Sequence, residues 1–229
     1  MQQETKFAIF NFEASDRVLV EEIGKYLDKQ APSIYHFFEL PFSDKVTINI
    51  IPTRIEFEKR FIHDHAWADD NFILPHWSIG YVANNQITYL SLADYKHTSH
   101  AYKKQDYPLA LEYFKKTLVH EFVHFVNKLF EKHRNCSPTI KYLLEGIATY
   151  LSGQKDGEKI DFNFSLQQLL ATDMKESCYA GWYLITKYLV ENYEKSFVFS
   201  LFESNRKAKE FLVNELYNKA KQYYDNRKK

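Results

Sequence analysis

The 229-residue chain carries 30 lysines and arginines against 30 aspartates and glutamates, and this even balance excludes the basic surface by which proteins bind nucleic acid. Its aromatic content of 17% excludes a disordered chain, and its length suits one large domain or two small lobes. No run of about 18 apolar residues occurs in it, so no membrane-spanning helix is expected.

The first 105 residues are predicted to alternate strands with helices. Apolar and β-branched residues indicate strands over 7–10, 46–51, 77–83 and 86–92, and helical spacing indicates helices over 18–27 and 55–62. Asn84 and Asn85 separate the last two strands. Because asparagine tolerates the positive φ of a tight turn, these strands are expected to pair as a hairpin. Residues 1–105 should therefore form an α/β lobe with a small mixed sheet.

From Asp106 onward the pattern is helical, and residues 106–229 are predicted to form a helical lobe. Asp106 and Pro108 are typical of a helix start, and Asn135 is typical of a helix end. The apolar stripe of this long helix consists of Leu118, Phe122, Phe125 and Leu129. Later helices are indicated over 165–170, 179–193, 197–202 and 207–224.

The long helix carries an H-E-x-x-H motif formed by His120, Glu121 and His124. Side chains four residues apart lie one above the other on a helix, so both imidazoles can reach one Zn²⁺ ion. Glu121 points about 100° away from His120, where it can accept a proton from a metal-bound water. The motif is typical of zinc peptidases. The alternative is an amphipathic helix with two solvated histidines on a face shared with Thr117.

A third metal ligand is expected from the helix that follows. A catalytic zinc ion takes three protein ligands and keeps one position open. Ser137-Pro138 is typical of a helix start, and Gly153 is typical of the residue after a helix end. The short link favours two antiparallel helices. Glu145, which is 21 residues after His124, can then face back toward that histidine.

These two helices resemble those of the gluzincins, which are the thermolysin-like and aminopeptidase N-like zinc peptidases and the small peptidase MA-like domains. In that family a glutamate ligand follows H-E-x-x-H after roughly twenty residues, in a W-L-x-E-G-x-A-x-Y-like helix. The matching run here is Tyr142-Leu143-Leu144-Glu145-Gly146-Ile147-Ala148-Thr149-Tyr150. The resemblance implies an α+β, zincin-like fold with the active-site helix between the two lobes. It also implies one Zn²⁺ per chain, bound by His120, His124 and Glu145.

Two further site residues are implied by the same resemblance. Thermolysin-like enzymes have a ligand-orienting aspartate four residues after the ligand glutamate, and Thr149 stands there, so its hydroxyl is expected to fill that role less strongly. Gluzincins often use a tyrosine or histidine from a later helix to stabilise the oxyanion. The run from Tyr179 to Leu184 resembles that helix in peptidase MA-like domains. Tyr179 is the first candidate and Tyr183 the second, and an ordinary core or surface tyrosine is the alternative for either.

The predicted hairpin is the candidate wall of the substrate cleft, because peptidases add an extended substrate to a sheet edge. Its sequence resembles the G-x-M-E-N strand and the next strand of aminopeptidase N-like enzymes, with an ordinary hairpin as the alternative. The substrate-binding residues are then Gly80, Tyr81, Val82 and Ala83. The glutamate that binds a free amine in that family is absent, since Ala83 and Asn84 stand there. Interior peptide bonds are therefore the expected targets.

The sequence thus predicts a zinc-dependent metallopeptidase, an endopeptidase of gluzincin type, that acts on a peptide or protein substrate. The metal would lower the pKa of its bound water toward about 7, and Glu121 would take the proton as the water attacks the scissile carbonyl. Zn²⁺ and Tyr179 would stabilise the oxyanion. The alternative is a non-catalytic zincin-fold module that binds proteins and retains zinc. The presence of Glu121, which is not a metal ligand, favours the enzyme over this non-catalytic module.

A cytoplasmic location is expected. Cys136 and Cys178 form no C-x-x-C pair, which fits free thiols in a reducing compartment. The first residues lack the apolar core of a signal peptide. A second metal site at His63 and His65, or at His97 and His100, is less expected than solvated histidines.

Overall fold

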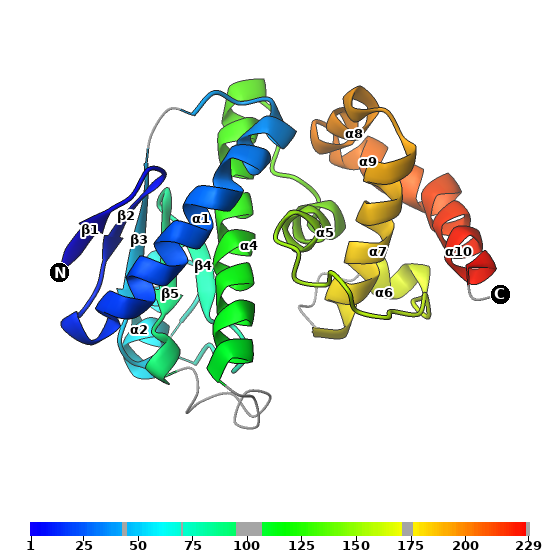
Figure 1. The fold of residues 1–229 in the computed structure, drawn as a ribbon. Coiled ribbons are helices and arrows are strands. Elements are labelled where there is room, and N and C mark those ends of the chain that lie inside the picture. The colour runs from blue at the N-terminus through cyan, green and yellow to red at the C-terminus, as the bar shows by residue number, and fades with distance from the viewer. Residues whose placement is uncertain (43–44, 70, 95–106, 171–175, 228–229) are drawn as a thin grey trace. The chain divides into compact units, whose positions relative to one another are not determined.

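A computed structural model describes residues 1–42, 45–69, 71–94, 107–170 and 176–227 (Figure 1). The chain divides into two compact units, Met1–Val126 and Asn127–Lys229. The first unit contains a mixed five-stranded sheet with helices, and the second consists of helices and their connections. The predicted α+β class and small mixed sheet are therefore confirmed. The division lies inside one long helix, whereas the predicted boundary between residues 105 and 106 lies outside the described residues.

The sheet of the first unit has the strand order β1-β2-β3-β5-β4. Its strands are β1 (Gln2–Glu4), β2 (Ala8–Asn11), β3 (Val46–Ile51), β4 (Gly80–Ala83) and β5 (Gln86–Leu90). β2, β3 and β5 run parallel, while β1 and β4 pair antiparallel with their neighbours. β4 thus lies at an edge of the sheet, which is the position that a substrate-binding strand requires.

β1 was not predicted from the sequence, and β4 is shorter than the strand predicted over 77–83. β1 is polar because it is a largely exposed edge strand, so it lacks the apolar alternation that indicates a strand. The residues just before β4 are held by hydrogen bonds from Arg54 and not by a full set of hydrogen bonds between strands. Its guanidinium donates to the backbone oxygens of Leu74, at 2.9 Å, and Ser78, at 2.5 Å.

Asn84 and Asn85 form the predicted turn between β4 and β5. Their φ angles of 49° and 58° are the left-handed pair of a type I′ turn, whose twist matches that of the flanking strands. The turn fixes the register of the hairpin, in which Gly80 lies opposite Tyr89.

The longer helices described in the first unit are α1 (Arg17–Phe38), α2 (Arg54–Asp64) and the larger part of α4 (Tyr107–Arg134). The predicted helices over 18–27 and 55–62 are confirmed as parts of α1 and α2. α4 matches the predicted long helix, and Asn135, with a φ of 49°, ends it as predicted.

α1 continues through Pro32 to Phe38, beyond its predicted end. A proline inside a helix removes a backbone hydrogen bond and costs about 3 kcal/mol or more. The neighbouring apolar residues Ala31 and Ile34 are fully buried, so the packing of this helix face offsets that cost. Glu39, with a left-handed φ of 55°, then ends the helix.

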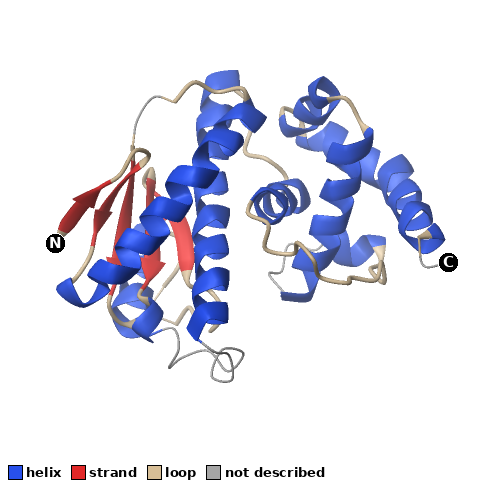
Figure 2. Cartoon of the chain, viewed as in Figure 1, coloured by secondary structure: helices blue, strands red, loops and turns tan. Residues whose placement is uncertain are grey.

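α4 and α2 lie on opposite faces of the sheet. The Tyr89 hydroxyl donates to the backbone oxygen of Phe114 on α4 at 2.9 Å. Tyr81 points to the other face, where its ring centroid is 5.4 Å from that of Phe57 on α2. α1 lies on the α4 face, and a ring contact joins the two helices (Figure 2).

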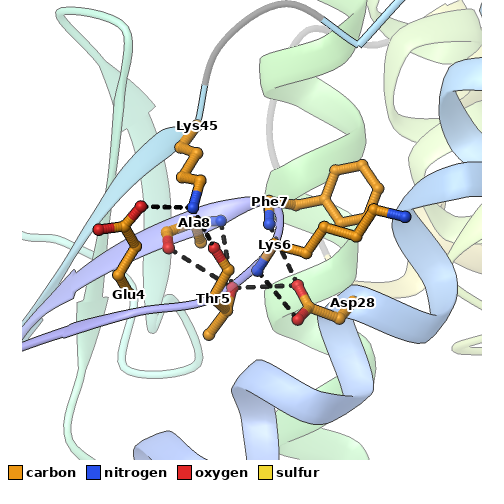
Figure 3. Close-up of polar contacts among 7 residues, drawn as sticks. All are labelled: Glu4, Thr5, Lys6, Phe7, Ala8, Asp28 and Lys45. Carbon is orange, nitrogen blue, oxygen red and sulfur yellow. Dashed lines mark hydrogen bonds and ion pairs between the residues drawn. The ribbon is translucent and has the colours of Figure 1, made fainter.

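Asp28 of α1 ties down the turn between β1 and β2 (Figure 3). Its carboxylate accepts hydrogen bonds from the Thr5 hydroxyl at 3.0 Å and from the N–H groups of Lys6 and Phe7 at 3.1 and 3.2 Å. Lys45, just before β3, donates to the Thr5 carbonyl at 2.6 Å. These bonds fix the β1 edge of the sheet, which is the edge far from β4.

The second unit contains α5 (Lys141–Leu151), α6 (Leu166–Leu170), α7 (Glu176–Asn192), α8 (Lys195–Phe202), α9 (Asn205–Phe211) and α10 (Tyr217–Asn226). The predicted helices over 165–170, 179–193 and 197–202 are confirmed. The helix predicted over 207–224 is formed by α9, a π-helical turn and α10.

Cys136 and Cys178 are free thiols, as predicted. In the described parts of the chain, every helix falls short of the length or apolar composition needed to cross a membrane.

The left-handed turn of the hairpin makes a testable prediction. A side chain with a branched Cβ disfavours left-handed backbone, so Asn85→Val should lower the free energy of unfolding by about 1–2 kcal/mol. Asn85→Gly should leave it equal or higher, because glycine adopts this backbone freely. Urea unfolding followed by circular dichroism measures both variants. A valine variant as stable as the wild type would contradict the turn geometry.

Candidate metal centre

Two imidazoles from successive turns of α4 form the centre of the candidate site. The Nε2 atoms of His120 and His124 are 3.0 Å apart. Their rings are nearly perpendicular, at 87°, with centroids 4.6 Å apart. His120 is 5% exposed and His124 is half-buried, so the alternative of two solvated histidines is wrong.

The spacing of the donor atoms fits a metal ion. Zinc–nitrogen bonds of about 2.05 Å at the tetrahedral angle place two ligand nitrogens about 3.3 Å apart, close to the separation of the histidine pair. His120, His124 and Glu145 each offer one ligand atom, and these atoms all lie within 4.8 Å of one another. The three residues expected to bind zinc are therefore found together. Among the described residues, no other group of three or more such side chains meets this criterion.

Glu121 lies against the backbone of the edge strand β4. It is 9% exposed, and a Cβ built on Gly80 would lie only 2.8 Å from its Cγ. The same Cβ would lie 2.6 Å from the Tyr89 ring, nearer than side-chain atoms approach. The absence of a side chain at Gly80 therefore allows the strand and the Glu121 side chain to be neighbours.

Glu145 is 5% exposed and lies in α5. α5 begins at Lys141, so the predicted helix start at Ser137-Pro138 is wrong. The reason is a competing hydrogen bond, since the Thr139 N–H donates to Oε1 of Glu131 at 2.6 Å. A side chain from the preceding helix thus holds this backbone outside the helix.

A buried polar network, which was not predicted from the sequence, fixes the same link. Asn127 on α4 is fully buried, and its Nδ2 donates to Oε1 of Glu131 at 2.8 Å and to Oγ1 of Thr139 at 3.2 Å. It lies three residues after His124, so the network joins the turn after the histidines to the residues that lead into α5. The sequence signal was an asparagine among apolar residues, four positions before a glutamate.

α5 packs closely on α7 at Gly146, the residue that follows Glu145. A Cβ on Gly146 would lie 2.0 Å from Oγ1 of Thr186 and 2.7 Å from the backbone oxygen of Trp182. The Trp182 indole N–H donates to the Leu169 carbonyl at 2.9 Å, which holds this part of α7 in place. The close contact fixes the position of α5 and of Glu145 within the second unit.

Thr149, the predicted ligand-orienting residue, is 1% exposed in α5. Its hydroxyl donates to the backbone oxygen of Glu145 at 2.8 Å. The Thr149 hydroxyl therefore uses its one proton in a hydrogen bond to the backbone of the turn that carries Glu145.

The two tyrosine candidates lie on α7. Tyr179 is half-buried, and its ring centroid is 5.3 Å from that of Trp182. The Tyr183 hydroxyl is 3.4 Å from Oδ1 of Asp156 and also 3.4 Å from Nζ of Lys187. Burial raises the pKa of Tyr183, so its hydroxyl stays protonated and can donate to Asp156. The Tyr183 hydroxyl is thus bonded to charged groups of its own unit.

Along β4, successive residues direct their backbone N–H and C=O groups alternately toward β5 and away from it. Residues that flank a two-residue turn exchange hydrogen bonds, so Ala83 and Gln86 form a bonded pair, and bonded pairs recur at every second residue. The Leu90 N–H donates to the Ile79 carbonyl at 2.8 Å, which agrees with this alternation. Gly80 lies between two bonded pairs and therefore directs its N–H and C=O away from β5.

His63 and His65 belong to no group of metal-binding side chains among the described residues. Nδ1 of His63 is 3.0 Å from Oδ1 of Asp64, and Nδ1 of His65 is 2.9 Å from the Phe61 carbonyl. The histidines at positions 97 and 100 lie outside the described residues.

No model of a known protein family matches the chain, no curated protein matches it, and no solved structure matches it. The candidate site therefore rests on its own residues and their geometry.

The contact at Gly146 yields a prediction about stability. Gly146→Ala should lower the free energy of unfolding by about 1–3 kcal/mol, because the added methyl group overpacks the contact with α7. Adding Thr186→Ala should recover only part of that loss, since the Trp182 carbonyl remains. Urea unfolding measures both variants. Wild-type stability in the single variant would show that α5 and α7 are not in close contact at this residue.

Proposed function

We propose that the chain is a zinc-dependent metallopeptidase with a gluzincin-type site and a zincin-like fold, cleaving interior bonds of peptides or proteins. The observation that carries the proposal is the group of ligand atoms from His120, His124 and Glu145 within 4.8 Å of one another. Two imidazoles and one carboxylate are the ligands of a known class of catalytic zinc sites. A structural zinc site needs a fourth protein ligand, and the group contains none among the described residues.

The three side chains would hold one Zn²⁺ per chain and leave a coordination position for water. When bound there, zinc supplies Lewis acidity that brings the pKa of a water molecule to about 7. His120 and Glu145 are each 5% exposed, so a cation held by these side chains would be largely removed from water.

Glu121 is the general base of the proposed reaction. It precedes the second histidine on α4 but is not part of the ligand group. It accepts the proton of the attacking water and then passes it to the nitrogen of the leaving amine. Its contact with β4 at Gly80 supports this role, because the base then lies beside the strand to which the substrate would pair.

Gly80 brings the substrate and the base together. A peptide that adds to β4 would bond to the N–H and C=O of Gly80, which point away from β5. The peptide residue that pairs there lies close to Glu121. The strand Gly80–Ala83 offers no carboxylate to hold a free amine, which supports cleavage of interior bonds.

Tyr179 remains the proposed oxyanion donor. It lies half-buried on α7, the helix in which the resemblance to peptidase MA-like domains places the oxyanion donor. A hydrogen-bond donor held at the developing oxyanion stabilises the transition state more than the substrate.

We also propose a cytoplasmic location, which the free thiols of Cys136 and Cys178 support, since reducing compartments keep cysteines unpaired.

Metal content tests the ligand assignment. The purified chain should hold about one zinc ion, measured by inductively coupled plasma mass spectrometry, and His120→Ala or His124→Ala should lose it. His133→Ala is the matched control, because His133 is an exposed histidine on the same helix. Full zinc occupancy in the His120→Ala, His124→Ala double variant would contradict the site.

Removal of the base separates metal binding from catalysis. Glu121→Gln should keep the zinc and lose hydrolysis of an N-acetylated peptide by on the order of 10² or more, because the amide cannot accept the proton. Glu112→Gln, at an exposed position of α4, is the control and should keep its activity. Undiminished hydrolysis by Glu121→Gln would rule out this base. A zinc-loaded wild type without activity would instead support the binding-module alternative.

A further inference from the structure

A cluster of aromatic side chains joins the edge strand β4 to α2 and to the loop that follows α2. Its members, the aromatic cluster, are Phe57, Phe61, His65, Trp67, Phe72 and Tyr81. Neighbouring ring centroids are 4.1 to 5.8 Å apart. Tyr81 belongs to β4 itself, so the cluster is continuous with the proposed substrate strand.

The cluster is buried at one end and exposed at the other. Phe57 and Phe61 are 0% and 7% exposed, whereas Trp67 is 67% exposed. His65 and Phe72 are partly exposed. Trp67 thus presents a large aromatic surface to solvent, with other rings of the cluster packed behind it.

The described residues of the loop that carries Trp67 contact α2 through ring packing and hydrogen bonds. Phe72 stacks on Phe61 with an angle of 11° between the rings, and the Trp67 ring stands perpendicular to that of Phe72. The end of the loop is fixed by Arg54, which donates to the carbonyls of Leu74 and Ser78. Trp67 is therefore exposed to solvent while its ring packs against other rings of the cluster.

The Tyr81 end of the cluster is fixed by a buried carboxylate. The Tyr81 hydroxyl donates to Oδ2 of Asp64 at 3.0 Å, and Arg60 Nε donates to the same oxygen at 2.9 Å. Burial would raise the pKa of Asp64, but hydrogen bonds from Arg60, His63 and Tyr81 outweigh it and lower the pKa. The ionised carboxylate thus holds the β4 side of the cluster to the end of α2.

The alternation of side chains along a strand directs part of a bound peptide toward this cluster. Paired residues of neighbouring strands share a face, so the peptide residue opposite Gly80 points to the Glu121 side. Its two neighbours in the peptide point to the opposite face, which is the face of Tyr81 and the cluster.

We propose that the aromatic cluster is a binding subsite for an apolar, preferably aromatic, side chain of the substrate, with Trp67 as its contact surface. The occupant is a residue adjacent in the peptide to the one that pairs with Gly80. This inference rests on the proposed peptidase function, and it defines the substrate class as extended peptides with apolar residues at that position. The aromatic ring of the substrate gains an edge-to-face or offset contact with Trp67 and leaves water.

Peptide binding tests the subsite without requiring turnover. The full chain with Glu121→Gln, loaded with zinc, is titrated into two fluorescein-labelled, capped peptides, Lys-Ala-X-Ala-X-Ala-Lys with X as phenylalanine or serine, and fluorescence anisotropy is recorded. The phenylalanine peptide should bind about tenfold more tightly, within the range for filling an apolar subsite. Adding Trp67→Ala should bring the two affinities to within about twofold of each other, whereas Trp67→Phe should keep most of the preference.

Ile55→Ala is the matched control for the loss of an exposed apolar side chain. Ile55 is 66% exposed in the same unit, lies on α2 and is not a member of the aromatic cluster, so this variant should keep the full preference. Circular dichroism verifies that each variant folds. Equal affinity of the parent for both peptides, or a preference that survives Trp67→Ala, would overturn the subsite.

Hydrolysis of the same two peptides by the chain with its native Glu121 is measured separately. Cleavage of both peptides at equal rates would keep the peptidase proposal and overturn the subsite. A Trp67-dependent binding preference without cleavage of either peptide would keep the subsite and overturn the peptidase proposal.

Discussion

The candidate site depends on the burial of one polar turn of helix α4. His120 and Glu121 are 5% and 9% exposed, and Glu145 is 5% exposed. Imidazoles and carboxylates leave water at a cost in free energy, unless hydrogen bonds or opposite charges compensate for it. In our proposal a divalent cation adds to the interactions that offset this cost. The separation of 3.0 Å between the two histidine Nε2 atoms is close to what such a cation requires.

Two glycines allow the close packing that positions the groups around this turn. Gly80 leaves room for the Glu121 side chain beside β4, so the proposed base and the proposed substrate strand lie together. Gly146 likewise lets α5 approach α7, which fixes the helix of Glu145. Asn127 acts by hydrogen bonding, since it holds the link that leads into α5. Each of these three residues helps to position part of the candidate site, the two glycines by close packing and Asn127 by hydrogen bonds.

Local sequence patterns predicted the features that depend on residues near in sequence. Helical spacing predicted the histidine pair, and asparagine chemistry predicted both the hairpin turn at Asn84 and the end of α4 at Asn135. The failures arose where distant residues decide the local structure. α1 passes Pro32 because its buried face continues to pack, and α5 starts late because the Glu131 side chain binds the Thr139 N–H. The aromatic cluster was missed because its members, spread along the sequence, come together only when α2 and β4 pack.

The most direct test of the central claim is a crystal structure with anomalous diffraction recorded on both sides of the zinc absorption edge. We expect one zinc peak about 2.0–2.2 Å from Nε2 of His120, Nε2 of His124 and a carboxylate oxygen of Glu145. No zinc peak at these residues in crystals grown with zinc, or a peak coordinated by other side chains, would contradict it.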